Sequence, residues 1–484
     1  MRSPCGRCTM FRVPDAGSAA LIERLNNLHE GPLVLPDVIR LGDAAVPGLE
    51  AILRGPSQAL PHARCMAADA LGAIGGPKAA SALVGALRDS IARTPDVISL
   101  EAERVVIDRI ANHLCAHREN DVIEALLEAL RITPYPACAR ALGELRDPRA
   151  IPLLIECLHD DAARGAALDA LRRFGRDACP ALIGTLIRPR LRRGLEAPSS
   201  IDARVAAARL LGELAQVALA PSAADVALRT ALTDRQRAVR IEAAIAIARR
   251  GWKAAPEATA TLAGGLDEAH WVQAERIMDA LARFGPAAEE TVVPLIALPV
   301  DDEGSRRRKI RAAIVAGRLR ASSAIVPLAA LAQIGDRELR LAVITALARI
   351  PATACSVLER FLLDREGPIR LRAVRALRDR RALGPALATE LLGDSDPEVR
   401  ILARASLLSN SPAAEFSLVR TLLTLGSRPR MAGIRIAQRI SAPLRGRSWI
   451  KGVRSRARLW WGAWECLIAV RCRAPPRRGW TLRG

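Results

Sequence analysis

The chain has 484 residues, of which 50% are apolar and only 3% aromatic, and its formal net charge is +21. This length exceeds what one compact core usually supports, so several domains or a repeat array are expected. Only four basic residues are lysine; the others are arginine, a bias that GC-rich coding produces together with abundant alanine, glycine and proline. The positive charge alone therefore does not indicate a nucleic-acid partner.

Residues 1–15 precede any helical pattern and are expected to form an N-terminal extension. They lack the apolar core of a signal peptide. Cys5 and Cys8 form a lone CxxC without the second pair that a zinc site needs, so no metal or other cofactor is expected. The ten cysteines have no paired spacing, which favours a reducing, cytoplasmic location. No window reaches the roughly 18 apolar residues of a membrane span.

Residues 16–441 repeat a unit of two helices joined by a turn rich in Asp, Gly or Pro. The second helix of each unit has an apolar stripe at helical spacing, as in VRIEAAIAIA from Val239. The most regular part is 322–440, where a marker arginine recurs every 30 residues. Extending this register upstream gives twelve marker positions: Arg64, Glu103, Tyr135, Arg164, Arg204, Arg240, Gln273, Arg311, Arg340, Arg370, Arg400 and Arg430. A period near 30 with two helices and no strands predicts an all-α solenoid of about twelve helical hairpins.

These units resemble HEAT repeats, particularly the short bacterial type known from phycobilisome (PBS) lyase subunits. The residues that carry the resemblance are Asp396–Arg400, Asp147–Leu154 and Arg64–Gly75. The resemblance implies a right-handed superhelix in which Asp and Arg side chains form a ladder between neighbouring turns. The expected ladder residues are Arg240, Arg340, Arg370 and Arg400 with Asp234, Asp336, Asp364 and Asp396. Ligand contact by these arginines is the alternative.

Three units are longer than the others because residues are inserted between their first and second helices, at 90–100, 188–200 and 299–309. Inserts at one point of a repeat lie on one edge of a solenoid, where partners often bind. The basic residues of two inserts are candidate partner-binding residues: Arg188, Arg190, Arg192, Arg193, Arg306, Arg307, Arg308 and Lys309. The alternative is that these inserts are solvated loops.

Arginines also recur five or nine positions beyond the marker, at Arg209, Arg249, Arg320, Arg349, Arg375 and Arg439. If the second helices line a concave face, these arginines favour an acidic partner. We therefore count Arg209, Arg249, Arg349 and Arg375 among the partner-binding candidates.

The segment 442–484 leaves the repeat register and holds five of the seven tryptophans among arginines and prolines. It is interpreted either as a basic aromatic tail that binds nucleic acid or an anionic surface, or as a disordered or non-native end.

No catalytic constellation accompanies the repeats. His113 and His117 are four apart, but HLCAH lacks the Glu of HExxH and no third ligand is evident. Three hypotheses remain. The leading one is a non-enzymatic scaffold that binds another, possibly acidic, protein along the concave face or the insert-bearing edge. The alternatives are nucleic-acid binding through the basic inserts and tail, and a phycobilin-lyase-like enzyme. Oligomeric state stays open.

Overall fold

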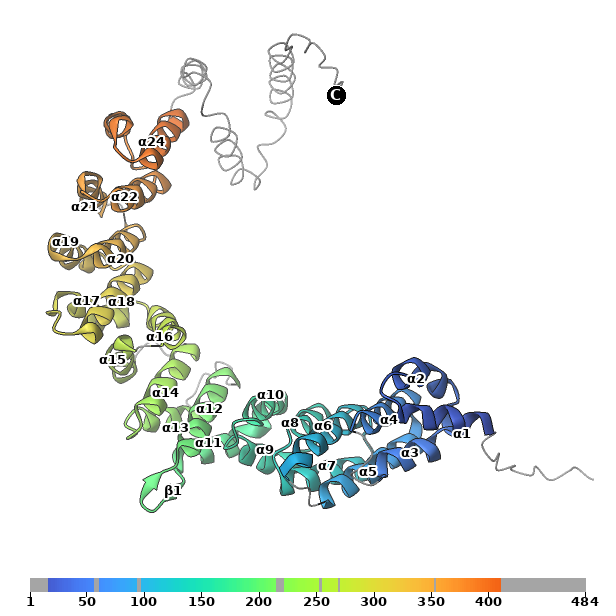
Figure 1. Ribbon diagram of the computed structural model, residues 1–484. Coiled ribbons are helices and arrows are strands. Elements are labelled where there is room, and N and C mark those ends of the chain that lie inside the picture. Colours follow the sequence, from blue (N-terminus) through green and yellow to red (C-terminus); the bar gives the residue numbers. More distant parts are fainter. Residues whose placement is uncertain are drawn as a thin grey trace, which may run out of the picture. The chain divides into compact units, whose positions relative to one another are not determined.

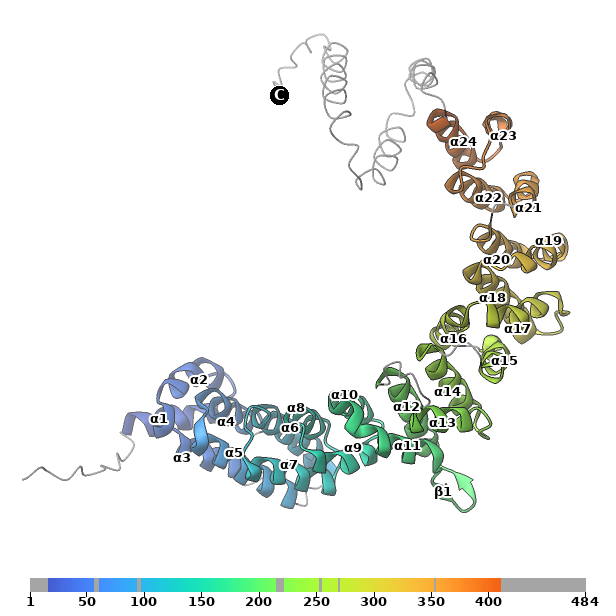
Figure 2. The ribbon, with the colours of Figure 1, turned by 180° about the vertical axis from the view of Figure 1, so that it is seen from behind.

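The computed structural model describes residues 16–55, 61–93, 97–214, 222–251, 255–268, 270–351 and 354–410, coloured in Figures 1 and 2. The predicted extension 1–15, the segment 442–484 and the marker Arg430 lie outside the described residues. The described chain is almost entirely helical, and its one sheet is a two-stranded hairpin, β1 (Leu191–Arg192) and β2 (Leu195–Glu196).

The helices alternate between two kinds after an N-terminal pair, α1 (Ala16–Glu23) and α2 (Gly31–Arg40). The first helices of the units, called A helices below, are α3 (Val46–Arg54), α5 (Gly76–Ala92), α7 (Asn120–Ile132), α9 (Ile151–Cys157), α11 (Cys179–Ile187), α13 (Ala223–Ala231), α15 (Pro256–Gly264), α17 (Pro286–Ala297), α19 (Ile325–Ile334), α21 (Cys355–Arg360) and α23 (Pro385–Glu390). The second, or B, helices are α4 (Pro61–Ile74), α6 (Val97–Leu114), α8 (Pro136–Leu145), α10 (Arg164–Phe174), α12 (Pro198–Leu214), α14 (Arg237–Arg249), α16 (Trp271–Phe284), α18 (Glu303–Leu319), α20 (Arg337–Leu347), α22 (Gly367–Asp379) and α24 (Pro397–Asn410).

Contacts divide the chain into two compact units. The first runs to Gly384 and includes Asp394–Val399, and the second comprises Pro385–Gly393 and the chain from Arg400. Within the first unit each A helix packs on the B helix that follows it, and successive B helices pack on one another, from α4 on α6 to α20 on α22. Most A helices likewise contact the next A helix. This two-layer stack is the predicted α-solenoid, and every predicted marker from Arg64 to Arg400 lies in a B helix, except Tyr135, which immediately precedes α8.

Small residues let consecutive B helices approach closely. A side chain added at Gly212 in α12 would place its Cβ 2.7 Å from the Cα of Ala246 in α14. Gly317 in α18 is packed in the same way on Ala346 in α20. The core between the layers consists mainly of fully buried leucine, isoleucine, valine and alanine. Burial of these aliphatic side chains, at about 25 cal/mol per Å² of apolar surface, is what holds the layers together.

The inserts differ from the expected loops, because much of their length extends helices. In the third insert, α18 begins at Glu303, where Asp302 and Ser305 form a capping box: each side chain bonds the backbone N–H of the other. Lys309 therefore lies inside the helix, on the same face as the buried Ala312 and Ala313, and is only 5% exposed. Its proposed role as a surface contact is wrong for this reason. In the second insert the chain forms β1 and β2, which the sequence analysis did not predict.

Candidate functional site

Turn aspartates connect several helical pairs to the pair before them. Asp364 accepts a hydrogen bond from Arg340, and Asp394 accepts two hydrogen bonds of 2.8 Å from Arg370. Each arginine therefore reaches the turn of the next helical pair. The same aspartates bond backbone N–H groups of their own turns, at Glu366 and Asp396. One carboxylate thus shapes its turn and joins two units.

The ladder differs in detail from the expected set. Asp234 is paired with Arg204 of the preceding unit, while Arg240 donates to the backbone carbonyls of Asp234 and Arg235. Asp336 caps α20 and binds Arg306, which the sequence analysis placed among the partner-binding residues. Asp396 accepts from the backbone N–H of Glu398 at the start of α24.

Most basic residues of the inserts form ion pairs or hydrogen bonds with other residues of this chain. Arg190 forms a bidentate pair with Glu156, which lowers the pKa of that carboxyl group. Arg306 binds Asp336 and Glu338, and Arg308 binds Asp267 at 2.9 Å. Arg307 donates to the backbone carbonyl of Asp267. By contrast, Arg188, Arg192 and Arg193 are exposed and form no ion pair with any described residue.

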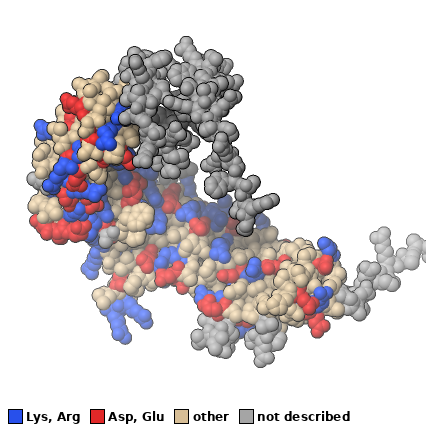
Figure 3. All heavy atoms as spheres, turned by 45° about the horizontal axis from the view of Figure 1, so that its top comes forward, with Lys and Arg blue, Asp and Glu red and all other residues tan. Residues whose placement is uncertain are grey.

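The arginines predicted to line the B-helix face are also mostly paired. Arg209 lies 3.4 Å from Glu242, Arg249 lies 3.1 Å from Glu213, and Arg375 lies 3.1 Å from Glu398. Arg349 is exposed and has no side-chain partner among the described residues. Figure 3 shows basic and acidic side chains interspersed over most of the face it presents, apart from one projecting group of basic side chains at the lower left. Such mixing does not produce the single-sign field that concentrates a polyanion.

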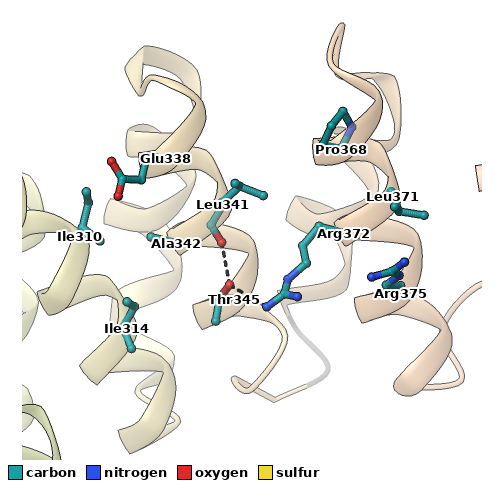
Figure 4. Close-up of a pocket in the computed structure, with 10 residues that line it drawn as sticks. All are labelled: Ile310, Ile314, Glu338, Leu341, Ala342, Thr345, Pro368, Leu371, Arg372 and Arg375. Carbon is teal, nitrogen blue, oxygen red and sulfur yellow. Dashed lines mark hydrogen bonds between the residues drawn. The ribbon is translucent and has the colours of Figure 1, made fainter. Parts of the chain in front are cut away.

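A groove with a volume of about 350 Å³ crosses three consecutive B helices of the first unit. Each helix contributes residues four apart on one face: Ile310 and Ile314 from α18, Leu341 and Thr345 from α20, and Leu371 and Arg375 from α22. Residues at this spacing lie one above the other, so the three helices present parallel rows of side chains (Figure 4). The isoleucines and leucines are only partly buried, which leaves apolar surface accessible.

Arginines and a carboxylate border this apolar floor. Arg372 extends from α22 toward α20, where it donates to the Thr345 hydroxyl at 3.4 Å (Figure 4). Arg375 lies on the same helix, and Glu338 lies at the start of α20. A hydrogen bond of 3.4 Å is long, so Arg372 can turn to a stronger acceptor at little cost. The groove can therefore accept an apolar segment that also carries an acidic group.

Sequence reasoning found Arg375 but missed the apolar part of the groove. Ile310, Ile314, Leu341 and Leu371 belong to helices whose other apolar residues are buried, and the pattern of one helix does not show which apolar positions a neighbour covers. The hairpin had a detectable signal, since Arg193-Gly194 between two leucines fits a tight two-residue turn. His113 is a partner of Asp69, with Nε2 2.8 Å from Oδ1.

No described helix combines the length and apolar character needed to cross a membrane.

Comparison with known proteins supports the repeat assignment. The model of the PBS lyase HEAT-like repeat matches residues 63–89 and 137–160. Among solved structures, a chain in the structure of Kap95p with RanGDP aligns with a TM-score of 0.53 at 12% identity, over 81% of this chain and 60% of that one. The chain thus spans less than two thirds of that protein's length.

Two other solved structures share less of the geometry. Importin beta aligns with a TM-score of 0.41 at 11% identity, over 85% of this chain and 72% of that one. Human deoxyhypusine hydroxylase aligns with a TM-score of 0.21 at 20% identity, over 66% of this chain and 98% of that one. Identities at this level reflect the fold alone, and a search of curated proteins gives no significant match.

Proposed function

Because the chain is a HEAT-repeat α-solenoid, we propose that it is a non-enzymatic scaffold that binds another protein through the groove on α18, α20 and α22. The observation that carries this proposal is the row of partly exposed isoleucine and leucine side chains bordered by Arg372 and Arg375. Exposed apolar side chains in a concave site, with a few polar groups that fix orientation, are the usual features of a recognition groove.

The occupant that fits is a protein segment with apolar side chains for the floor and a carboxylate for Arg372, because Arg375 is already paired with Glu398. Each apolar side chain that becomes buried in the groove contributes about 1.5–3 kcal/mol before the entropic cost of association. The carboxylate adds specificity and speeds the encounter more than it adds affinity. Among the other solved structures, Kap121p is bound to the extreme C-terminus of Cdc14p, to Ulp1p, to Nup53p or to Pho4p. Their TM-scores with this chain are below 0.5, so the proposal rests on the groove.

Ion pairing makes nucleic-acid binding the weaker alternative. Arg190, Arg306 and Arg308 already satisfy carboxylates of the same chain. Contact with phosphate would have to break these pairs, and the released carboxylates would repel the backbone. The lyase alternative gains no support from any observed group.

The proposal is tested by selecting peptides from a random display library on the wild-type protein. Enriched sequences should combine apolar residues with Asp or Glu. Their affinity should fall about tenfold or more when Leu341→Asp or Arg372→Glu changes the groove. Val326→Asp is the matched control, because Val326 is 77% exposed on the neighbouring A helix and outside the groove. Failure to enrich any sequence, or affinities that Leu341→Asp leaves unchanged, would refute the proposal.

A further inference from the structure

The β1–β2 hairpin stands out from the helices around it and carries two exposed leucines. Leu191 is 63% exposed and Leu195 is 76% exposed. Both views of the ribbon show β1 projecting beyond the neighbouring helices (Figures 1 and 2). Leu191 pairs with Glu196 and Leu195 pairs with Arg192. Because cross-strand partners share one face of a hairpin, Leu195 lies beside Arg192, and Leu191 lies on the opposite face with Glu196.

The base of the hairpin is fixed to the solenoid by buried polar groups. Glu196 is paired with Arg204 at 3.1 Å, and the side chains of both residues are almost fully buried. Ser200 donates to Glu196 at 2.9 Å and accepts from the backbone N–H of Arg190 at 3.0 Å. These bonds, together with the Arg190–Glu156 pair, determine where the hairpin projects. The element is therefore a preformed structure, and a partner that binds it pays little ordering entropy.

The same bonds remove the negative charge from the insert and leave positive charge at its tip. Glu196 is the one acidic residue in 188–200, and Arg204 neutralises it. Arg188, Arg192 and Arg193 have no such partner among the described residues. The tip thus presents uncompensated guanidinium groups, with Leu195 on the same face as Arg192.

We infer that this hairpin is a docking element for an acidic, leucine-rich segment of a partner protein. Guanidinium groups bind carboxylates in bidentate geometry, and Leu195, on the same face as Arg192, supplies the apolar contact that desolvates that pair. The contact is made by side chains, because strands of two residues are too short for addition of a partner strand and Ser200 occupies the N–H of Arg190. The hairpin shares no residue with the groove on α18, α20 and α22, so this inference does not depend on the proposed function.

Two other partners fit the hairpin less well. Single-stranded nucleic acid is held by bases that stack on aromatic side chains, and the insert 188–200 contains none. An anionic membrane would need a larger apolar surface than two leucines, since stable anchoring generally takes two independent signals. An acidic protein segment uses both the arginines and the leucines.

The test measures fluorescence anisotropy of a labelled peptide of alternating Glu and Leu with the full chain. One variant, Arg192→Gln with Arg193→Asn, removes two charges and keeps the turn. The backbone φ values of Arg193 and Gly194 are +54° and +81°, and Asn-Gly is the preferred pair for this type I′ geometry. A second variant, Leu191→Ser with Leu195→Ser, removes the apolar contact. The control, Arg118→Gln with Arg283→Gln, removes two exposed arginines elsewhere.

We expect the wild type and the control to bind the peptide equally, and both hairpin variants to bind at least about tenfold more weakly. Replacing Glu by Gln in the peptide should weaken binding by a similar factor. The inference is overturned if neither hairpin variant changes the affinity, or if the wild type does not bind the peptide. It is also overturned if Leu341→Asp abolishes binding while the hairpin variants do not, because the peptide would then occupy the groove. The same proteins are also offered an oligothymidine or phosphatidylglycerol vesicles. If the wild type binds one of these more tightly than the peptide, and only the arginine variant loses that binding, the hairpin is assigned to that partner and the inference is overturned.

Discussion

Arg370 and Asp394 form a bidentate ion pair that joins α22 to the turn before α24, with two N–O distances of 2.8 Å. Both side chains are about nine-tenths buried. Arg370 also donates to the backbone carbonyl of Asp364 at the turn before its own helix. A single guanidinium therefore connects two successive turns, and the pKa of Arg370 is raised chiefly by its hydrogen bond to Asp394.

Removal of the carboxylate at this pair should destabilise the C-terminal units strongly. Asp394→Ala leaves a buried arginine without its partner, which costs about 3–5 kcal/mol. The solenoid need not unfold as one unit, so the measurement is amide hydrogen exchange across α22, the turn 394–396 and the start of α24. Glu398→Ala is the control, because its pair with Arg375 joins the same helices at the surface and should contribute less than about 1 kcal/mol. Equal effects of the two changes would contradict the ladder.

Alanine at Gly212 should destabilise the protein although alanine favours helices. A Cβ at this position would lie 2.7 Å from both Cα and Cβ of Ala246, and a backbone atom cannot move aside as a flexible side chain can. We expect Gly212→Ala to cost about 1–3 kcal/mol in chemical denaturation. Gly184→Ala, in α11, has no heavy atom within 4 Å of the added carbon and should stabilise by about 0.5–1 kcal/mol. Stabilisation by both changes would mean that α12 and α14 are not in close contact.

Glycine at Arg320 should stabilise the protein. Arg320 ends α18 in the left-handed αL conformation with a φ of +57°, whereas glycines supply the positive φ after α10 and α16, at Gly175 and Gly285. Arginine has a steric penalty there that glycine avoids. Arg320→Gly should raise the free energy of unfolding by about 0.5–1 kcal/mol. Arg320→Ala removes the same charge without relieving the backbone and should give no gain, so a gain with alanine would assign the effect to charge.

Turn aspartates should make the fold less stable in acid. Burial alone would raise the pKa of Asp336, but the N–H of Leu339 and the guanidinium of Arg306 outweigh it and hold that pKa below its usual range. The hydrogen bond from Arg149 likewise lowers the pKa of Asp147. A group with a depressed folded pKa stabilises the fold above its unfolded pKa, and this contribution disappears as the pH falls through the folded value.

We therefore expect the melting temperature to be level above about pH 5 and to fall progressively below about pH 4. Asp336→Asn can still cap α20 but no longer titrates, so its melting temperature should fall less steeply in acid than that of the wild type. Parallel profiles for the two proteins would contradict the role of Asp336.

The repeat register was predictable because it depends on local sequence. Markers such as Arg340 and Arg370 lie where predicted, in successive B helices, because apolar periodicity, turn aspartates and helix-ending glycines act within one helical hairpin. The pairing partners were less predictable. Arg370 binds Asp394 rather than Asp396. Arg306 pairs with the turn aspartate Asp336, although its insert was expected to contact a partner. Which carboxylate a guanidinium reaches depends on how one unit is stacked on the next.

The sequence by itself determined the architecture, an all-α solenoid of HEAT-like pairs, because each pair contains the signals for its own helices and turn. Only the tertiary structure decided which side chains remain available to a partner. Stacking of the helical pairs buried Lys309 and paired Arg190 and Arg308 with acidic residues far away in the sequence. It left Leu341 and Leu371 partly exposed in one groove. It also positioned a hairpin whose leucines are exposed. Whether a side chain is available to a partner depends on which residues of the neighbouring helical pairs contact it, and the sequence pattern of one pair does not specify those contacts.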